Sequence, residues 1–287
     1  MNEKPINLLY LLGAGRSGTT MLTTVLNNHP QIYAVGEMHQ FLDYVTENKD
    51  CSCGSNVSAC EFWGPVIDKL DHTLLEEPNT VSFSNNLECH KYIPKHYLKA
   101  TPNKRYSALV NMIFNAISQE VDEPWLLDSS KYISRFLLLR KNKRFNVKGI
   151  YMVRDVRGVV HSFGKKVQTQ KGPLSAILYY TLINFWGQLV TTFDRNIIQI
   201  RYEDFVNNPD EVLKKLEGHV FQENSETTRL DQKTFKIPHI IAGNRLRSQK
   251  QLVIKKDLAW KKNISRGKQI LYYFLAFPTM FVNRYKV

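Results

Sequence analysis

The sequence of 287 residues has only four cysteines, too few for a small fold held together by disulfides. It has no apolar run that could cross a bilayer, because Asn184 and Gln188 interrupt the long stretch 174–190, which we expect to form a buried helix. It also lacks a zinc-finger spacing, an aromatic RNA-binding signature and a basic low-complexity tail. These absences argue against a disulfide scaffold, a membrane-spanning protein and a nucleic-acid partner.

Acidic residues are in the minority, with 26 Asp and Glu against 39 Lys and Arg and a formal net charge of +13. Such an excess fits anionic ligands, and it also fits an anionic membrane surface. The start of the sequence does not read as a secretory leader, because no small-residue cleavage site follows its short apolar run. We therefore expect a cytoplasmic protein.

One apolar segment near the C-terminus leaves two interpretations open. Residues 270–282 are aromatic and apolar, contain Pro278 and have basic neighbours on both sides. We expect this segment to cover the core as a terminal helix, and peripheral contact with a membrane interface is the alternative.

A glycine-rich loop follows the apolar run 6–12, which predicts a buried strand. Gly13 and Gly18 have the spacing of a phosphate-binding loop, but position 19 is Thr19 where nucleotide triphosphatases have lysine. The cation lies inside the loop instead, as Arg16. A helix is expected to start at Thr19, and its N-terminus favours negative charge. The loop therefore predicts an anion site whose chemistry is not phosphoryl transfer.

A second anion-binding element is predicted after the strand 147–153. Arg154 comes directly after this strand, where open α/β sheets bind their ligands, and Ser162 follows about two helical turns later. A guanidinium and a hydroxyl suit a separate phosphate. An Arg-Asp pair at a helix start is the plainer alternative.

Together these two elements resemble the sulfotransferases that use 3′-phosphoadenosine-5′-phosphosulfate (PAPS). The resemblance covers roughly residues 6 to 262 and is closer to the membrane-associated and bacterial members, which have Arg-Ser-Gly-Thr-Thr. It implies that the first element holds the 5′-phosphosulfate and the second the 3′-phosphate. It also implies PAPS as the sulfuryl donor, with no metal ion required at the site.

Lys166 lies one turn after Ser162 and could add charge near the 3′-phosphate. Tyr202, after the strand 196–200, matches a family tyrosine near the nucleotide, and residues 239–247 resemble the family's late loop that folds over the nucleotide. A core tyrosine and a plain surface turn are the alternatives for the last two. The cofactor-binding candidates are Gly15, Arg16, Ser17, Gly18, Thr19, Thr20, Arg154, Ser162, Lys166, Tyr202, Asn244, Arg245 and Arg247.

Sulfuryl transfer needs a base for the acceptor hydroxyl and positive charge on the sulfonate and the leaving oxygen. Glu37 follows the short strand 31–35 and Gly36, and the resemblance to tyrosylprotein-type members implies that it is the base. Glu37 could also favour the start of the next helix, and His39 is the rival base, because imidazole titrates near neutrality. Arg16 and Lys131 are the candidate cations. Lys131 follows the strand 124–128 and resembles the family's lysine that stabilises the transition state; a surface residue in the first turn of the next helix is the alternative.

The cysteines permit two structures. Cys51 and Cys53 with the later Cys60 could bind zinc, although Cys-x-Cys is not a usual structural spacing. A Cys53–Cys60 disulfide would imply an oxidising compartment. We expect reduced thiols, including Cys89, and no metal site.

Strands near 6–12, 31–35, 124–128, 147–153 and 196–201 alternate with helices, which predicts an α/β fold of the phosphate-loop type with a mostly parallel sheet flanked by helices. We expect a single domain over 1–287. Residues about 50–105 interrupt the pattern and read as an insertion that shapes the acceptor pocket, or as plain surface loop.

The favoured hypothesis is sulfuryl transfer from PAPS to an acceptor hydroxyl, in line, with Glu37 as base. The resemblance favours a carbohydrate or glycolipid acceptor, and a protein tyrosine or small alcohol fits the same site. A degenerate nucleotide kinase and an inactive anion-binding module of the same fold are the alternatives. The oligomeric state is not readable from the sequence.

Overall fold

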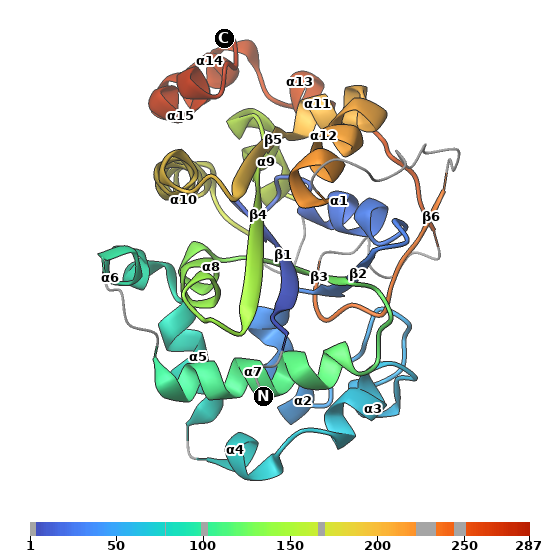
Figure 1. The fold of residues 1–287 in the computed structure, drawn as a ribbon. Coiled ribbons are helices and arrows are strands. Elements are labelled where there is room, and N and C mark those ends of the chain that lie inside the picture. The colour runs from blue at the N-terminus through green and yellow to red at the C-terminus, as the bar shows by residue number, and fades with distance from the viewer. Residues whose placement is uncertain (1–3, 78, 99–102, 166–169, 222–233, 244–250) are drawn as a thin grey trace. The chain divides into compact units, whose positions relative to one another are not determined.

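The structure is a computed structural model that describes residues 4–77, 79–98, 103–165, 170–221, 234–243 and 251–287 (Figure 1). Its main sheet is five-stranded and mostly parallel, with strand order β2-β3-β1-β4-β5. The strands are β1 (Ile6–Leu12), β2 (Ile32–Gly36), β3 (Trp125–Lys131), β4 (Phe145–Val153) and β5 (Ile197–Arg201). This confirms the predicted fold class.

The central strand β1 is apolar along nearly its whole length because both of its faces are covered, as parallel sheets require. The edge strand β2 pairs in parallel with β3, with Ile32 opposite Trp125 and Gly36 opposite Asp128. The residues that follow these two strands therefore leave the sheet side by side. The same reasoning applies to β1 and its other neighbour, β4.

Strand β3 is longer than the sequence predicts, because it continues past Asp128 to Lys131. The Asp128 carboxylate accepts the backbone N–H of Ser130 at 2.9 Å, and Ser129 and Ser130 are buried. This local bond satisfies polar groups that would otherwise favour a turn.

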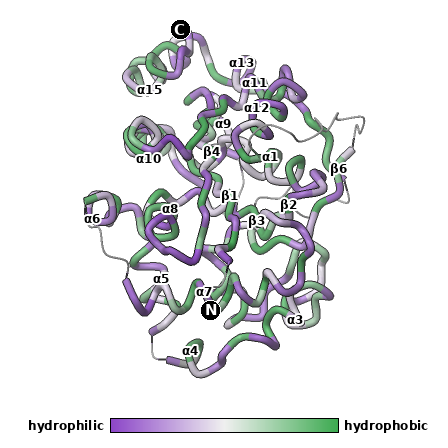
Figure 2. Tube along the Cα trace, viewed as in Figure 1, coloured by the Kyte–Doolittle hydropathy of each residue, from purple (hydrophilic) through white to green (hydrophobic). Residues whose placement is uncertain are grey.

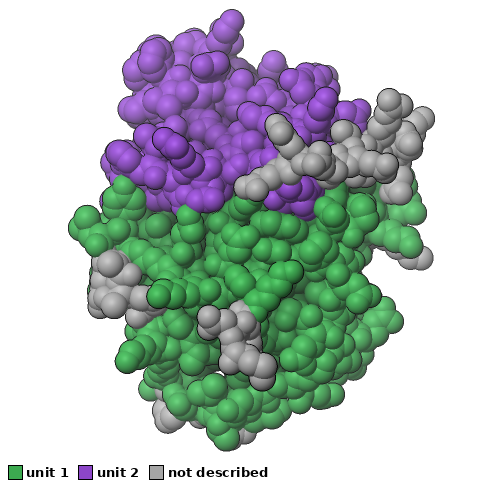
Figure 3. All heavy atoms as spheres, in the orientation of Figure 1, with its two compact units in different colours: residues 1–11, 20–149, 234–252 green, residues 12–19, 150–233, 253–287 purple. Residues whose placement is uncertain are grey.

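The chain divides into two compact units, coloured separately in Figure 3. Unit 1 comprises residues 1–11, 20–149 and 234–252, and unit 2 comprises 12–19, 150–233 and 253–287. Within unit 1, β6 (Phe235–Lys236) and β7 (Gln251–Leu252) form a small antiparallel pair. The helices up to residue 140 are α1 (Thr19–Leu26), α2 (Phe41–Thr46), α3 (Trp63–Asp68), α4 (His72–Glu76), α5 (Thr80–Glu88), α6 (Ile93–Leu98), α7 (Lys104–Ser118) and α8 (Ile133–Arg140), with short 3-10 turns at Met38–Gln40, Val57–Ala59 and His90–Tyr92.

Unit 2 is mostly helical around the ends of β4 and β5. Its helices are α9 (Val156–Phe163), α10 (Pro173–Phe193), α11 (Tyr202–Asn207), α12 (Pro209–Phe221), α13 (Ala259–Asn263), α14 (Arg266–Leu275) and α15 (Phe277–Val282). Helix α9, which begins just after Arg154, packs against α10, α13 and α14.

Two expectations about apolar segments need correction. Helix α10 is not wholly buried: one face packs inward and the other exposes Leu178, 72% accessible. The C-terminal segment forms two helices, α14 and α15, because Pro278 suits the first turn of a new helix better than a helix interior. Met280 is fully buried, whereas Phe281 is 66% exposed, and Figure 2 shows the apolar residues of α15 in green. Within the described residues, no helix is long and apolar enough to cross a membrane.

Candidate functional site

The loop 13–19 closely approaches its neighbours at two glycines. Gly13 has φ +139°, and a Cβ there would lie 2.3 Å from the carbonyl oxygen of Met152. Gly18 has φ +93°, and a Cβ would lie 2.4 Å from the ring of Tyr202. Both the backbone conformation and the lack of space therefore require glycine. The loop leads directly into α1, whose N-terminus is a favourable place for an anion.

Arg16 lies at the turn of this loop in a left-handed conformation, with φ 70°. Its guanidinium lies 5.6 Å from the ring centre of Phe163. The N–H of Gly15 donates to the hydroxyl of Tyr179 at 3.0 Å. Ser17 is fully buried, and its hydroxyl has no hydrogen-bond partner among the described residues. Buried hydroxyls normally have such a partner, so this one is a candidate donor to a bound anion.

Arg154 joins the second predicted element to the loop. Its Nη1 donates to the carbonyl oxygen of Arg16 at 3.1 Å, and its Nη2 lies 3.3 Å from Asp257 Oδ2. The guanidinium stacks over Tyr202, 4.2 Å from the ring centre. Lys165 Nζ lies 3.5 Å from the same Asp257 oxygen. Burial favours a raised pKa for Asp257, but the two cations and hydrogen bonds outweigh it and hold the pKa below its usual value.

The structure thus brings Arg16, Arg154 and Tyr202 together within unit 2, as the sequence predicts for residues that follow neighbouring strands. Ser162 is half-buried in the last turn of α9. Tyr179 and Asp257 were missed, because no local pattern connects them to the loop. Lys166, Asn244, Arg245 and Arg247 lie outside the described residues.

The two other candidate catalytic residues meet in unit 1. Lys131 Nζ donates to Glu37 Oε1 in an ion pair whose side chains are only 15% and 14% exposed. Lys131, like Arg16, has φ 70°, a conformation that costs a non-glycine residue free energy. Gln40 Nε2 also donates to Glu37 Oε2 at 3.4 Å. The pair forms because Glu37 and Lys131 extend from the parallel strands β2 and β3.

A segment from far along the chain fixes the backbone at Glu37. The N–H of Glu37 donates to the carbonyl oxygen of Ile241 at 2.8 Å, and the N–H of Ile241 donates to Val35 at 3.1 Å. Gly36 has φ +88°, and a Cβ there would lie 2.3 Å from the Ile241 carbonyl oxygen. Glycine is therefore required immediately before Glu37.

His39, the rival base, lies beside the pair in a different environment. Its backbone N–H donates to Ser130 Oγ at 2.9 Å, and its ring packs 4.4 Å from that of Tyr132. Burial, reinforced by the positive charge of Lys131, lowers the pKa of His39 well below its usual value. The imidazole is therefore neutral at physiological pH.

A buried charge network supports the end of β3. Arg135 Nε donates to Asp128 Oδ2 at 2.9 Å, and its Nη1 pairs with Glu88. Tyr106 donates its hydroxyl to Glu88 at 2.6 Å. Burial raises the pKa of Glu88, although Arg135 opposes the shift. The network fixes Asp128, whose other oxygen holds Ser130 beside Lys131.

None of the four cysteines forms a disulfide in this structure. Three of them, Cys51, Cys53 and Cys60, lie with His239 in one cluster, and their potential ligand atoms are all within 4.8 Å of one another. The expectation of no metal site did not foresee this cluster, because His239 is distant in sequence.

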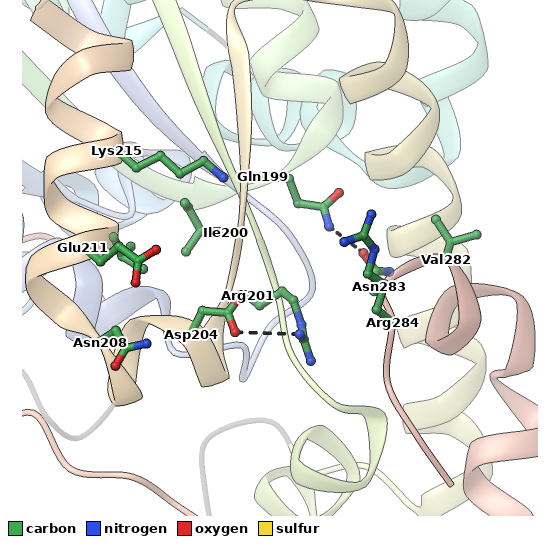
Figure 4. A pocket seen from close by; sticks show the side chains of 11 residues that line it. Gln199, Ile200, Arg201, Asp204, Asn208, Glu211, Lys215, Val282, Asn283 and Arg284 are labelled. Carbon is green, nitrogen blue, oxygen red and sulfur yellow. Dashed lines mark hydrogen bonds and ion pairs between the residues drawn. The ribbon is translucent and has the colours of Figure 1, made fainter.

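A cavity of about 550 Å³ in unit 2 contains none of the predicted site residues (Figure 4). It lies between β5, α12 and the end of α15, and its charges are mixed. Arg201 pairs with Asp204 at 3.7 Å, and Glu211 and Lys215 line the same wall. With Arg284, three cations and two carboxylates line the cavity, and none of them belongs to either predicted anion-binding element.

The sulfotransferase family matches the sequence over residues 9–220. No curated protein matches it. The fold is similar to the sulfotransferase domain from the curacin biosynthetic pathway, with a TM-score of 0.57, 18% identity and coverage of 100% of both chains. It is also similar to mouse sulfotransferase SULT7A1 complexed with PAP, with a TM-score of 0.50, 11% identity and coverage of 97% of this chain and 86% of that chain.

The family match covers both predicted anion-binding elements, Glu37 and Lys131, and most of the five-stranded sheet. The chain belongs to the sulfotransferase family and is a sulfotransferase enzyme.

Proposed function

We propose that PAPS is the sulfuryl donor and that the unit 2 cluster binds its two phosphate ends. The observation that carries this is the hydrogen bond from Arg154 to the Arg16 carbonyl, which joins the two anion-binding elements. The loop N–H groups, Arg16, Thr19 and Thr20 would hold the 5′-phosphosulfate. Arg154 and Ser162 would hold the 3′-phosphate, and Tyr202 lies against the Arg154 guanidinium. The PAP bound to mouse SULT7A1 supports the same nucleotide class.

The donor is tested by thermal unfolding with 3′,5′-adenosine bisphosphate without added magnesium or chelator, in parallel with ATP and magnesium. A ligand at 100 times its Kd adds about 2.7 kcal/mol to the free energy of unfolding. We expect stabilisation by the bisphosphate alone. Stabilisation only by magnesium-ATP would contradict the proposal and support the degenerate kinase.

The chemistry assigned to unit 1 is proton removal. The acceptor oxygen attacks sulfur in line while the bond from sulfur to the bridging phosphate oxygen breaks, and the hydroxyl proton passes to a Glu37 oxygen. The products are a sulfate ester and 3′,5′-adenosine bisphosphate. Lys131 and Arg16 neutralise charge on the sulfonate and the leaving oxygen. These charges perform the task without a catalytic metal.

Glu37 is the stronger candidate for the base because a carboxylate becomes neutral when it accepts a proton, whereas a partly buried imidazole becomes charged. The Glu37 side chain retains some solvent access, and Lys131 holds it in place. His39 is neutral and could also accept a proton, but desolvation opposes the charged imidazolium that would result. The contrast predicts different consequences of removing each group.

We propose a carbohydrate or glycolipid hydroxyl as the acceptor, with the segment of about 50–105 shaping its pocket within one sulfotransferase domain. Four helices, α3 to α6, occur in this segment, so it can present a defined surface. The test is transfer from labelled PAPS to panels of oligosaccharides, glycolipids, tyrosine peptides and small alcohols. Transfer confined to peptides or small alcohols would contradict this choice.

A peripheral membrane contact through α14 and α15 is proposed for such a lipid-linked acceptor. Phe274, Phe277 and Phe281 are 42–66% exposed, and Arg266 and Lys268 lie on the same segment. Apolar side chains beside cations suit an interface with anionic lipid. Flotation with anionic vesicles should recover the protein, and Phe281→Ser with Phe277→Ser should reduce recovery. Equal recovery of both proteins would contradict the contact.

A further inference from the structure

Three cysteines and a histidine converge in unit 1, and none of them is among the reacting groups assigned above. Cys53 Sγ lies 3.8 Å from Cys60 Sγ, and Cys60 Sγ lies 3.2 Å from His239 Nδ1. Cys51 completes a set in which all four potential ligand atoms are within 4.8 Å of one another. Cys51 and Cys60 are buried, and Cys53 is at the surface.

The Cys53–Cys60 distance matches what a shared metal ion would impose. Two thiolates bound to one tetrahedral zinc at about 2.3 Å have sulfur atoms about 3.8 Å apart, whereas disulfide sulfur atoms are about 2 Å apart. Three thiolates and one imidazole form a complete structural zinc set, and soft sulfur ligands exclude magnesium and calcium. We propose that Cys51, Cys53, Cys60 and His239 bind a structural zinc ion.

The surroundings orient the histidine as a ligand. Its other ring nitrogen, Nε2, lies 3.0 Å from Glu61 Oε1. A carboxylate that accepts this N–H leaves Nδ1 as the lone-pair donor, and Nδ1 is the atom that faces Cys60. The ring of Phe62 packs beside His239 at 6.4 Å between ring centres. Glu61 thus serves as the outer partner of the site.

The backbone around the cluster is fixed from both sides. The Ser52 hydroxyl donates to the Pro238 carbonyl at 2.5 Å and accepts the N–H of Ile240 at 2.9 Å. Trp63 Nε1 donates to the His239 carbonyl at 2.9 Å. These bonds hold the cysteine loop and the segment 238–240 in register, so the ligands do not need a large movement to bind zinc.

The zinc ion would fasten this segment to the end of β2. Residue 241 directly follows and accepts the N–H of Glu37. The metal would therefore secure the backbone that positions Glu37 without taking part in the transfer itself. The metal site itself stands on the ligand geometry and does not depend on the proposed donor or base.

The first test is the metal content of the unmodified chain, purified without a chelator under reducing conditions. Elemental analysis should find about one zinc per chain. After removal of zinc, titration with Co²⁺ should give thiolate-to-cobalt charge-transfer absorption that saturates at about one equivalent. The absence of both zinc and cobalt absorption would overturn the proposal, as would a Cys53–Cys60 disulfide found by peptide mapping.

Matched variants separate ligands from other thiols. Cys53→Ser removes the exposed ligand and should lose the zinc, whereas Cys89→Ser, outside the cluster, should keep it. Glu61→Gln should retain the fold, because its side chain is 83% exposed, and weaken metal affinity about 10- to 100-fold. Full zinc in Cys53→Ser would overturn the ligand set, and unchanged affinity in Glu61→Gln would overturn the role of Glu61.

Discussion

The loop cluster of unit 2 and the Glu37–Lys131 pair of unit 1 present a cation in the same way but balance its charge differently. Arg16 and Lys131 both have φ 70°, in the left-handed region. Among the described residues, Arg16 is the only non-glycine residue of the loop 13–19 with a positive φ, and Lys131 is the only one of strand β3. In unit 2 one carboxylate, Asp257, faces both Arg154 and Lys165. In unit 1 one carboxylate faces one ammonium group.

The difference separates ligand binding from proton transfer. A cluster with more cations than anions retains attraction for phosphate, which suits the two phosphate groups of a nucleotide that are bound but not themselves transferred. A balanced pair has a carboxylate that can accept a proton and an ammonium group that can then turn to a developing negative charge. Left-handed backbone at both cations stores strain of about 1–3 kcal/mol each, which the surrounding contacts must offset.

Removing the carboxylate should have the largest effect. Glu37→Gln keeps the size of the side chain but cannot accept the proton, so we expect kcat to fall about 10²- to 10⁴-fold. Binding of 3′,5′-adenosine bisphosphate, measured by calorimetry, should be preserved because the loop cluster is untouched. His39→Asn is the control and should retain most of the activity. Loss of activity in His39→Asn with turnover kept in Glu37→Gln would reverse the assignment.

The buried charge network that supports the Glu37–Lys131 pair should be nearly as sensitive to substitution. Arg135→Met leaves Glu88 and Asp128 buried without their cation, and we expect the free energy of unfolding to fall by about 3–5 kcal/mol. Urea unfolding measures this loss. Arg105→Met, which removes an exposed partner of Glu77, should cost less than about 1 kcal/mol. Equal losses would mean that the buried network does not support β3.

Arg154→Ala tests the loop cluster of unit 2, which has more cations than carboxylates. A charge-assisted hydrogen bond contributes about 1.5–3 kcal/mol, so affinity for 3′,5′-adenosine bisphosphate should fall about 10- to 150-fold. Affinity for adenosine 5′-phosphosulfate, which lacks the 3′-phosphate, should fall much less. Equal weakening of both ligands would show that Arg154 supports the loop as a whole. Neither ligand should bind differently to Lys215→Ala, which changes the separate cavity of unit 2.

The smallest effect concerns pH and arises in unit 1. Burial lowers the pKa of His90 to about 4, and its ring stacks 4.5 Å from that of Tyr132, beside Lys131. The His90 imidazole takes up a proton near pH 6.5 in the unfolded chain but not in the folded chain. Its contribution to the free energy of unfolding is therefore fully present above pH 6.5 and is lost as the pH falls below it. Between pH 7 and 5 His90 should contribute a loss of about 2 kcal/mol. His90→Asn should show a smaller fall in urea unfolding, and an unchanged fall would contradict the shift.

Much of the sheet could be predicted because buried parallel strands are continuous apolar runs. Strand β1 occupies the predicted residues, and Arg16 and Arg154 meet because their strands are neighbours. The extension of β3 could not be predicted, since it depends on a side-chain bond from Asp128. The helices between residues 63 and 98 were missed because they are short and their polar residues resemble those of loops.

The residues that contact the sites from far along the sequence could not be predicted, for a different reason. Tyr179, Asp257 and His239 contact their sites across more than a hundred residues, and no local periodicity records such contacts. Cysteine spacing alone suggested either zinc or a disulfide, and only the approach of His239 adds a fourth ligand. Sequence patterns therefore identified the chemistry-bearing motifs but not the residues that complete them.

The attachment of Ile241 to β2 also bears on the order of events during synthesis. β2 is an edge strand, and its end is paired only when Ile241 arrives, about 200 residues after Glu37. At 5–20 residues per second, a nascent chain leaves that edge open for roughly 10–40 s. An open edge is a template for wrong pairing with other chains. The yield of folded protein during expression should therefore change with translation speed and temperature. The free energy of unfolding of the folded protein should change less with these conditions.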